Sequence, residues 1–415
     1  MTGTERSGPG TGPSGGGGPS RAAGAGVFGD LVGQDAVVAA LRGAAAAASA
    51  VLRGEPNTGM THAWLFTGPP GSGRSVAARA FAAALLCPDG GCGHCPSCHQ
   101  VRAGTHADLL LVRPDGLSYG VKQTRNLVLR AAGVPSGGRW RVVLFEDADR
   151  ATEQAANALL KAIEEPAPRT VWLLCAPSAE ELVTTIRSRC RLVTLRTPPA
   201  EAIAEVLAAE GVTPERALSA ARAAQGHIGR ARRLATDADA AARRDDVLAV
   251  PPRLTGLGPA LSAAAALVKA AQAEADAITA DLDEPERGAL RRAFGEGSTG
   301  KGVAKAVRGV AGAMKELEDR QKSRATRLKR DALDRALLDL AAFYRDVLAI
   351  QVGSAVDLAS AGHEADVRRL ADATSAESTV RRIQAVMTCR ERLELNVAPL
   401  LAVEEMTLAL ATARP

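Results

Sequence analysis

The feature that most constrains this chain is a glycine-rich turn between an apolar strand and a helix. It reads GPPGSGRS and follows the apolar run AWLFT at residues 63–67. The spacing matches the phosphate-loop template GxxxxGK followed by Ser or Thr, whose glycines let backbone N–H groups curl around phosphates. Arginine replaces the template lysine, and its planar fork differs from a compact ammonium. The turn either binds nucleotide or keeps only the shape, and its candidate ligands are Gly68, Gly71, Gly73, Arg74 and Ser75.

Apolar strands alternate with helices through the first half of the chain. Further strands are expected at 109–113, 141–145, 171–175 and 191–195. This alternation predicts a parallel sheet covered by helices on both faces. Beyond Pro198-Pro199 the pattern is helical, with breaks expected at Pro285, Gly295–Gly300 and Gly353. We therefore predict an α/β domain of the P-loop NTPase type, followed by a small helical domain and an all-α C-terminal domain.

A second motif, RVVLFEDAD at residues 141–149, delivers acidic side chains at the end of an apolar strand. This is the Walker B arrangement, in which one carboxylate holds Mg²⁺ and the next positions the attacking water. Here the order is Glu146-Asp147, the reverse of the usual Asp-Glu. The reversed order displaces each carboxylate by about one methylene, and a misplacement of a catalytic group by about 1 Å can lower the reaction rate about a hundredfold. The two altered Walker motifs together favour a protein that kept the fold and lost fast hydrolysis.

A third motif, SRC at residues 188–190, follows the helix after the fourth strand. An arginine at the edge of a nucleotide-binding domain can reach the γ-phosphate on a neighbouring subunit, where it stabilises transition-state charge. Arg189 is therefore a candidate arginine finger acting in trans. On its own the motif is weak evidence, because a solvated arginine is the alternative, but its order and spacing relative to the other two motifs strengthen it.

Four of the seven cysteines lie within twelve residues, with the spacing C-x4-C-x2-C-x2-C. Four thiolates suit a closed, tetrahedral Zn²⁺ site, and disulfides are rare in the cytosol. An iron–sulfur cluster also uses closely spaced cysteines, and a site without metal remains a further alternative. The candidate ligands are Cys87, Cys92, Cys95 and Cys98.

Taken together, these residues resemble a known family. VGQ at 32–34, GPPGSGRS, FEDAD, NALLKAIEEP at 157–166 and SRC are similar in order and spacing to the clamp-loader branch of the AAA+ proteins. The resemblance covers about residues 27–235, and the four-cysteine insertion belongs to its bacterial branch. It implies an AAA+ domain, a helical lid and a helical collar used for assembly. It also favours zinc as the metal of the cysteine cluster.

Four departures separate two types within this family. The ATPase type, tau/gamma, has the phosphate-loop lysine, the Asp-Glu order, a polar sensor after the fourth strand and a sensor-2 arginine in the lid. This chain has instead Arg74, Glu146-Asp147, Cys175-Ala176-Pro177, and Gly229 with Arg230 one residue late. The resemblance is therefore closest to the delta-prime type, which lends its SRC arginine to a neighbour. An ATP-hydrolysing tau/gamma-type motor and a free-standing zinc-containing DNA-binding protein are the alternatives.

The resemblance implies partners and a role. A pentameric ring with tau/gamma and delta subunits would open the sliding clamp and load it onto primer–template DNA, as part of a DNA polymerase III holoenzyme. Intrinsic ATPase activity is expected to be weak or absent, with ATP and Mg²⁺ binding at the altered site left open. We expect a disordered tail over 1–26, an AAA+ domain over 27–199 with a zinc module at 87–98, a lid over 200–255 and a collar over 256–415.

Composition excludes several other classes. Every apolar run of 18 or more residues carries a charge, and residues 1–26 lack the apolar core of a signal peptide, so we expect a cytoplasmic protein at the nucleoid. Aromatics make up only 3%, which argues against stacking of bases on rings. Residues 301–335 hold 11 Lys and Arg against 5 Asp and Glu, and this basic segment is either a solvated helix face or a surface for DNA or a partner.

Overall fold

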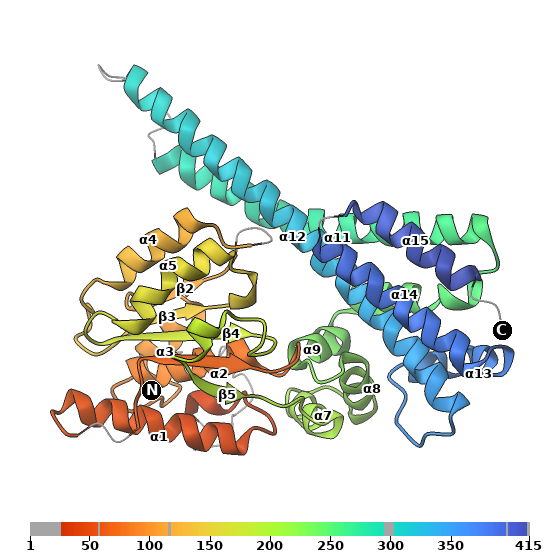
Figure 1. Ribbon diagram of the computed structural model, residues 1–415, viewed down its shortest axis with the longest axis horizontal. Helices are drawn as coiled ribbons and strands as arrows, with labels where there is room; N and C mark the ends of the chain where they lie inside the picture. The colour runs from red at the N-terminus through yellow and green to blue at the C-terminus, as the bar shows by residue number, and fades with distance from the viewer. Residues whose placement is uncertain (1–25, 57–58, 115–117, 294–302, 396, 413–415) are drawn as a thin grey trace, which may run out of the picture.

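The core of the first domain is a five-stranded parallel sheet (Figure 1). The computed structural model describes residues 26–56, 59–114, 118–293, 303–395 and 397–412. The strand order is β2-β3-β4-β1-β5, so the two strands that precede the sequence motifs at 68–75 and 146–149 are separated by β4. The strands are β1 (Ala63–Thr67), β2 (Leu109–Val112), β3 (Arg141–Phe145), β4 (Thr170–Ala176) and β5 (Arg191–Thr194).

Helices cover both faces of the sheet, and strand alternation divides its side chains between two apolar clusters. Trp64 and Phe66 of β1 face one cluster with α1, α2 and α3, while Leu65 faces the other with α4 and α5. The predicted fold class is thus confirmed. The elements here are η1 (Gly26–Phe28), α1 (Asp35–Leu52), α2 (Arg74–Leu86), α3 (Pro96–Ala103), α4 (Val121–Ala131), η2 (Ala148–Arg150), α5 (Glu153–Glu164) and α6 (Thr184–Arg187).

Helix α1 is long and apolar enough to cross a membrane by length and composition alone, and is the single such helix among the described residues. In the structure its Leu41, Ala44 and Ala48 are buried in the same cluster as α2 and the sheet. In this structure the apolar side of α1 therefore packs against the core of the sheet domain.

A small helical lid follows the sheet. It is built on alanine, with Ala217, Ala221 and Ala231 fully buried around Ile203 and Leu207. Small side chains permit close helix packing, which compensates for the scarcity of aromatic rings. The lid helices are α7 (Ala200–Ala209), α8 (Pro214–Ala224) and α9 (Ile228–Thr236), and α10 (Ala238–Leu248) leads into the C-terminal region.

The C-terminal region is entirely helical, as predicted. Helices α11 and α12 form a long hairpin whose far end extends away from the rest of the molecule (Figure 1). Phe343, Tyr344 and Val347 of α12 anchor its other end in a core with α14 and α15. The elements are η3 (Pro251–Arg253), α11 (Leu257–Ala293), α12 (Val303–Gln351), η4 (Ala361–His363), α13 (Glu364–Ala373), α14 (Ala376–Glu394) and α15 (Pro399–Thr412).

One predicted break is wrong. Pro285 lies inside α11, although proline removes a helix hydrogen bond. Packing against α12 holds this stretch, because Gln321 Nε2 donates to the Asp283 carbonyl at 3.1 Å and Arg324 bonds both Asp283 and Glu286. The predicted tail over 1–26 lies outside the described residues except for Gly26, as does part of the basic segment at 301–335.

Candidate functional site

The glycine-rich turn joins β1 to α2 at the carboxyl edge of the sheet. Gly71 and Gly73 adopt φ values of 89° and 90°, which L side chains rarely reach, and Gly73 directly precedes the first turn of α2. The lid packs onto this turn, because a Cβ added at Gly71 would lie 2.6 Å from Cβ of His227. The turn therefore keeps the shape of a phosphate loop, with the first residues of α9 pressed against it.

The side chain of Arg74 turns back onto the loop. Its Nη1 donates to the carbonyl oxygen of Gly68 at 2.8 Å, so the guanidinium is engaged by the backbone of the turn itself. Ser72 is buried beneath the turn, whereas Ser75 is half-buried at the start of α2. The cation that replaces the template lysine thus has a partner inside the protein.

Glu146, the first acidic residue of the Walker B motif, is buried between two arginines. Arg79 of α2 reaches its Oε1 at 3.0 Å, and Arg113, just after β2, reaches its Oε2 at 2.7 Å. The hydroxyl of buried Tyr119 donates to the Glu146 backbone carbonyl. Two cations thus flank the carboxylate that the motif predicts as a Mg²⁺ ligand.

The second carboxylate also meets an arginine. Asp147 has a left-handed φ of 49°, and its Oδ2 lies 3.4 Å from Nη2 of Arg327 on α12. Arg327 also donates to the Pro114 carbonyl at 2.7 Å. Burial raises the pKa of nearby Asp149, and the charge of Asp147 adds to that rise. Because both Walker B carboxylates are ion-paired, this edge does not fit a Mg²⁺-nucleotide in a hydrolytic arrangement.

Arg189 lies away from this edge, after α6. Its side chain is 38% exposed and pairs with Glu164, the last residue of α5, at 2.5 Å between Nη2 and Oε1. Its Nη1 donates to the Thr185 carbonyl at 2.8 Å and to Ser188 Oγ at 3.2 Å. The guanidinium is therefore held in one orientation at the surface, separate from the chain's own glycine-rich turn.

The lid is fixed to the C-terminal region by a buried carboxylate. Asp339 of α12 pairs with Arg230 of α9, and its Oδ1 accepts from Arg244 Nε of α10 at 3.0 Å. Asp339 is only 5% exposed, so both arginines are needed to satisfy its charge. Arg230, the residue next to the expected sensor-2 position, thus turns to α12.

The four cysteines of the motif converge between the end of α2 and the start of α3. All four Sγ atoms lie within 4.8 Å of one another, with Cys87 Sγ 3.7 Å from Cys92 Sγ and 3.6 Å from Cys95 Sγ. A tetrahedral Zn²⁺ with bonds of about 2.3 Å places its sulfurs about 3.8 Å apart, so the set fits a single zinc-sized ion. Two backbone N–H groups, of Gly93 and Cys98, point at cysteine sulfurs.

The sheet domain is similar in sequence to known proteins. Residues 47–199 match the family described as "DNA polymerase III, delta subunit". The delta-prime subunit of Pseudomonas aeruginosa is 37% identical over 175 residues, which cover 37% of this chain and 53% of the relative. The resemblance to delta-prime subunits is confirmed. The Bacillus subtilis delta-prime subunit is 34% identical over 38% of this chain and 49% of the relative, so the chain spans about half the length of these relatives.

More distant similarities extend beyond delta-prime. The gamma/tau subunit of Mycobacterium tuberculosis is 33% identical over 44% of this chain and 30% of the relative. Among solved structures, a gamma subunit-related protein of Thermotoga maritima is 15% identical over 71% of this chain and 99% of that chain, with a TM-score of 0.30. A Thermotoga maritima RuvB mutant is 18% identical over 53% of this chain and 64% of that chain, with a TM-score of 0.35.

The sheet domain brings together some of the predicted site residues and separates others. The glycine-rich turn and the Walker B pair share one edge of the sheet, whereas Arg189 and the cysteine cluster lie elsewhere. Sequence reasoning missed the cations that engage the carboxylates, which are Arg79, Arg113 and Arg327. Of these three arginines, only Arg79 could have been suggested by the sequence, because it lies just over one helical turn into α2 and therefore close to the glycine-rich turn.

Proposed function

We propose that this chain is the delta-prime-type subunit of a DNA polymerase III clamp loader. It assembles with tau/gamma and delta subunits and helps to load the sliding clamp onto primer–template DNA in the cytoplasm. The similarity of residues 47–199 to delta-prime subunits supports this proposal, as does the full set of clamp-loader motifs. The helical C-terminal region is the proposed collar through which the subunits assemble.

The observation that carries the proposal is the ion pairing of the Walker B edge. Glu146 and Asp147 both have arginine partners, and Arg74 bonds to the loop that it would need to leave to contact a phosphate. A hydrolytic site needs one carboxylate for Mg²⁺ and one for water. The arrangement therefore favours an assembly subunit without turnover over an ATP-hydrolysing tau/gamma-type motor.

The first test measures the isolated subunit. Equilibrium binding of ATP and steady-state ATPase activity are measured on the purified full chain. We expect negligible ATPase activity, whatever the affinity for ATP. Turnover comparable with an ordinary AAA+ motor would refute this proposal and favour the motor alternative.

Arg189 is the proposed arginine finger for a neighbouring subunit. Its exposure and its fixed orientation beside Glu164 support this role. Such arginines contribute about 10³–10⁵ to the rate at the site that they complete. Arg189→Ala is therefore expected to abolish hydrolysis at one site of the reconstituted complex and to leave assembly intact.

A matched control is available two residues earlier, at the end of α6. Arg187 is 41% exposed and lies 3.9 Å from Glu180, so Arg187→Ala removes a similar charge from the same surface. We expect the Arg187 variant to keep full complex ATPase activity. Equal activity of both variants would exclude the trans role of Arg189.

The cysteine cluster is a proposed structural Zn²⁺ site. Bound Zn²⁺ would be held by Cys87, Cys92, Cys95 and Cys98, and would tie the end of α2 to the start of α3. Four thiolates complete a tetrahedron, so no position remains open for catalysis. The convergence of all four sulfurs on one point favours a single ion over an iron–sulfur cluster.

A further inference from the structure

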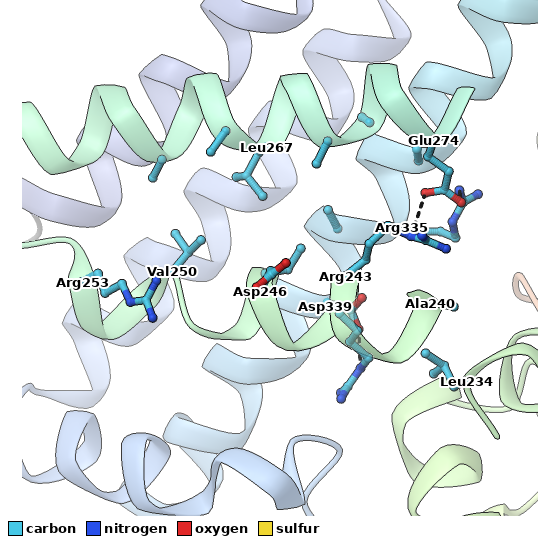
Figure 2. A pocket seen from close by; sticks show the side chains of 18 of the residues that line it. Leu234, Ala240, Arg243, Asp246, Val250, Arg253, Leu267, Glu274, Arg335 and Asp339 are labelled. Carbon is cyan, nitrogen blue, oxygen red and sulfur yellow. Dashed lines mark hydrogen bonds and ion pairs between the residues drawn. The ribbon is translucent and has the colours of Figure 1, made fainter. Parts of the chain in front are cut away.

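A groove of about 560 Å³ lies between the lid and the C-terminal helices (Figure 2). Helix α11 forms one wall, the α9–α10 segment forms the other, and α12 closes the bottom. Figure 2 shows Leu267 of α11 and Val250 beyond α10 pointing into the space between these walls. This volume is within the range of ligand-binding sites, and the groove belongs neither to the glycine-rich turn nor to the cysteine cluster.

The α11 wall is a stripe of small apolar residues at helical spacing. It runs over about three turns through Ala263, Ala266, Leu267, Ala270 and Ala271 and ends at Glu274, a span of about 16 Å. Ala266 and Ala270 are exposed at the surface of this wall. A stripe of mostly small side chains lets another helix approach closely, and the three leucines and two valines that line the groove provide apolar contacts for its side chains.

The lining of the groove carries an excess of positive charge. Six arginines and three carboxylates line it, which gives a net charge of +3. Three of the arginines share Glu274, with Arg233 at 2.8 Å, Arg335 at 2.9 Å and Arg243 at 4.0 Å. Arg253 lies at the opposite end and is exposed (Figure 2). A ligand that matches this pattern needs an apolar face and negative charges at its flanks.

We propose that this groove binds an acidic amphipathic helix of a partner protein. All three walls are helical, so they offer no strand edge for an extended peptide, and an apolar stripe with i, i+3 and i+4 spacing is the surface that receives a helix. The lining contains no aromatic residue, which disfavours a nucleotide base. Leucine-type side chains of the partner fill the groove, and its acidic residues meet the more exposed arginines of the lining, such as Arg253.

The test uses a defined probe and the full-length chain. The probe is a fluorescein-labelled helical peptide of about 16 residues, with leucines at i, i+3 and i+7 and glutamates on the flanks. Fluorescence anisotropy measures its affinity. A second peptide with lysines in place of the glutamates tests the charge requirement. We expect the glutamate peptide to bind at least about tenfold more tightly, with a Kd that rises with salt.

Two variants localise the binding. Ala266→Trp fills the exposed wall of the groove and is expected to weaken binding of the glutamate peptide at least about tenfold. Ala265→Trp adds the same ring to the neighbouring exposed position, which does not line the groove, and is expected to bind normally. Circular dichroism checks that both variants are folded.

Arg253→Glu reverses one charge of the lining and is expected to weaken binding several-fold without affecting the apolar wall. The proposal is overturned if the glutamate peptide fails to bind, if the lysine peptide binds equally well, or if Ala266→Trp and Ala265→Trp behave alike. Because the measurement needs only the isolated chain, its outcome is independent of whether the chain acts in a clamp loader.

Discussion

The pairing of Glu146 with two arginines gives a prediction whose magnitude follows from burial. Its side chain is 11% exposed, that of Arg79 is 27% exposed and that of Arg113 is 51% exposed. Breaking a fully buried ion pair costs about 3–5 kcal/mol, whereas an exposed pair contributes about 0–1 kcal/mol. Glu146→Gln keeps the shape and removes the charge, so we expect it to lower the free energy of unfolding by about 2 kcal/mol.

The two arginines are expected to contribute unequally. Arg79→Gln should cost about 2 kcal/mol because its guanidinium is largely withdrawn from water, and Arg113→Gln less than about 1 kcal/mol because solvent screens it. In double-mutant cycles, Glu146 should couple to Arg79 by about 1–2 kcal/mol and more weakly to Arg113. The cycles separate the interaction energy of each pair from the effect of removing either side chain alone.

The chain offers a local probe for this measurement. Trp64, Trp140 and Trp172 are its three tryptophans, and all lie in the sheet domain. Their fluorescence in urea therefore follows unfolding of that domain alone, and a loss of about 2 kcal/mol shifts the midpoint by about 1 M. ATPase activity of the reconstituted complex should not change with Glu146→Gln. A coupling to Arg79 below about 0.5 kcal/mol, or a complex that loses hydrolysis, would refute the reasoning.

Three further predictions concern other parts of the chain. Cys95→Ser should reduce bound zinc from one equivalent to none by atomic absorption and expose the α2–α3 junction to proteolysis, and an unchanged metal content would exclude this ligand set. A hydrogen bond from Arg324 lowers the pKa of Glu286 to about 2, so its contribution to the α11–α12 hairpin is full above about pH 4.5 and is lost as the pH falls towards 2. Pepsin cleavage of the hairpin should accelerate over that interval, less so in Arg324→Gln, and equal profiles would contradict this account. Asp339→Asn should speed hydrogen exchange in α9 by about tenfold or more, because it removes the charge that Arg230 and Arg244 share, and unchanged exchange would show that the lid is held otherwise.

The sheet could be predicted because its strands are short apolar runs, each followed closely by a helix. β1 was predicted at 63–67 and β3 at 141–145, and both have these bounds in the structure. Buried parallel strands leave this signal because both of their faces must be apolar. The boundaries drawn at 199/200 and 255/256 and the roles given to Arg189 and the glycine-rich turn stay predictions.

The charge partners could not be predicted in the same way. Arg327 reaches Asp147 from a position 180 residues later, and an arginine on a helix that also carries many other cations leaves no periodic signal. The break expected at Pro285 was wrong for a related reason, since the contacts that support α11 there come from Gln321 and Arg324 on another helix. Local sequence rules describe one segment at a time, whereas these contacts join distant segments.

Helix α12 passes through the whole molecule as one continuous element of 49 residues. Along its length it meets the hairpin partner α11, the Walker B edge through Arg327, the lid through Asp339 and the C-terminal core through Phe343. A helix cannot bend sharply without a break in its hydrogen bonds. A displacement of the described part of the hairpin would therefore be transmitted along α12 to the sheet domain and the lid. A partner that binds the hairpin would therefore be coupled through α12 to both the sheet domain and the lid.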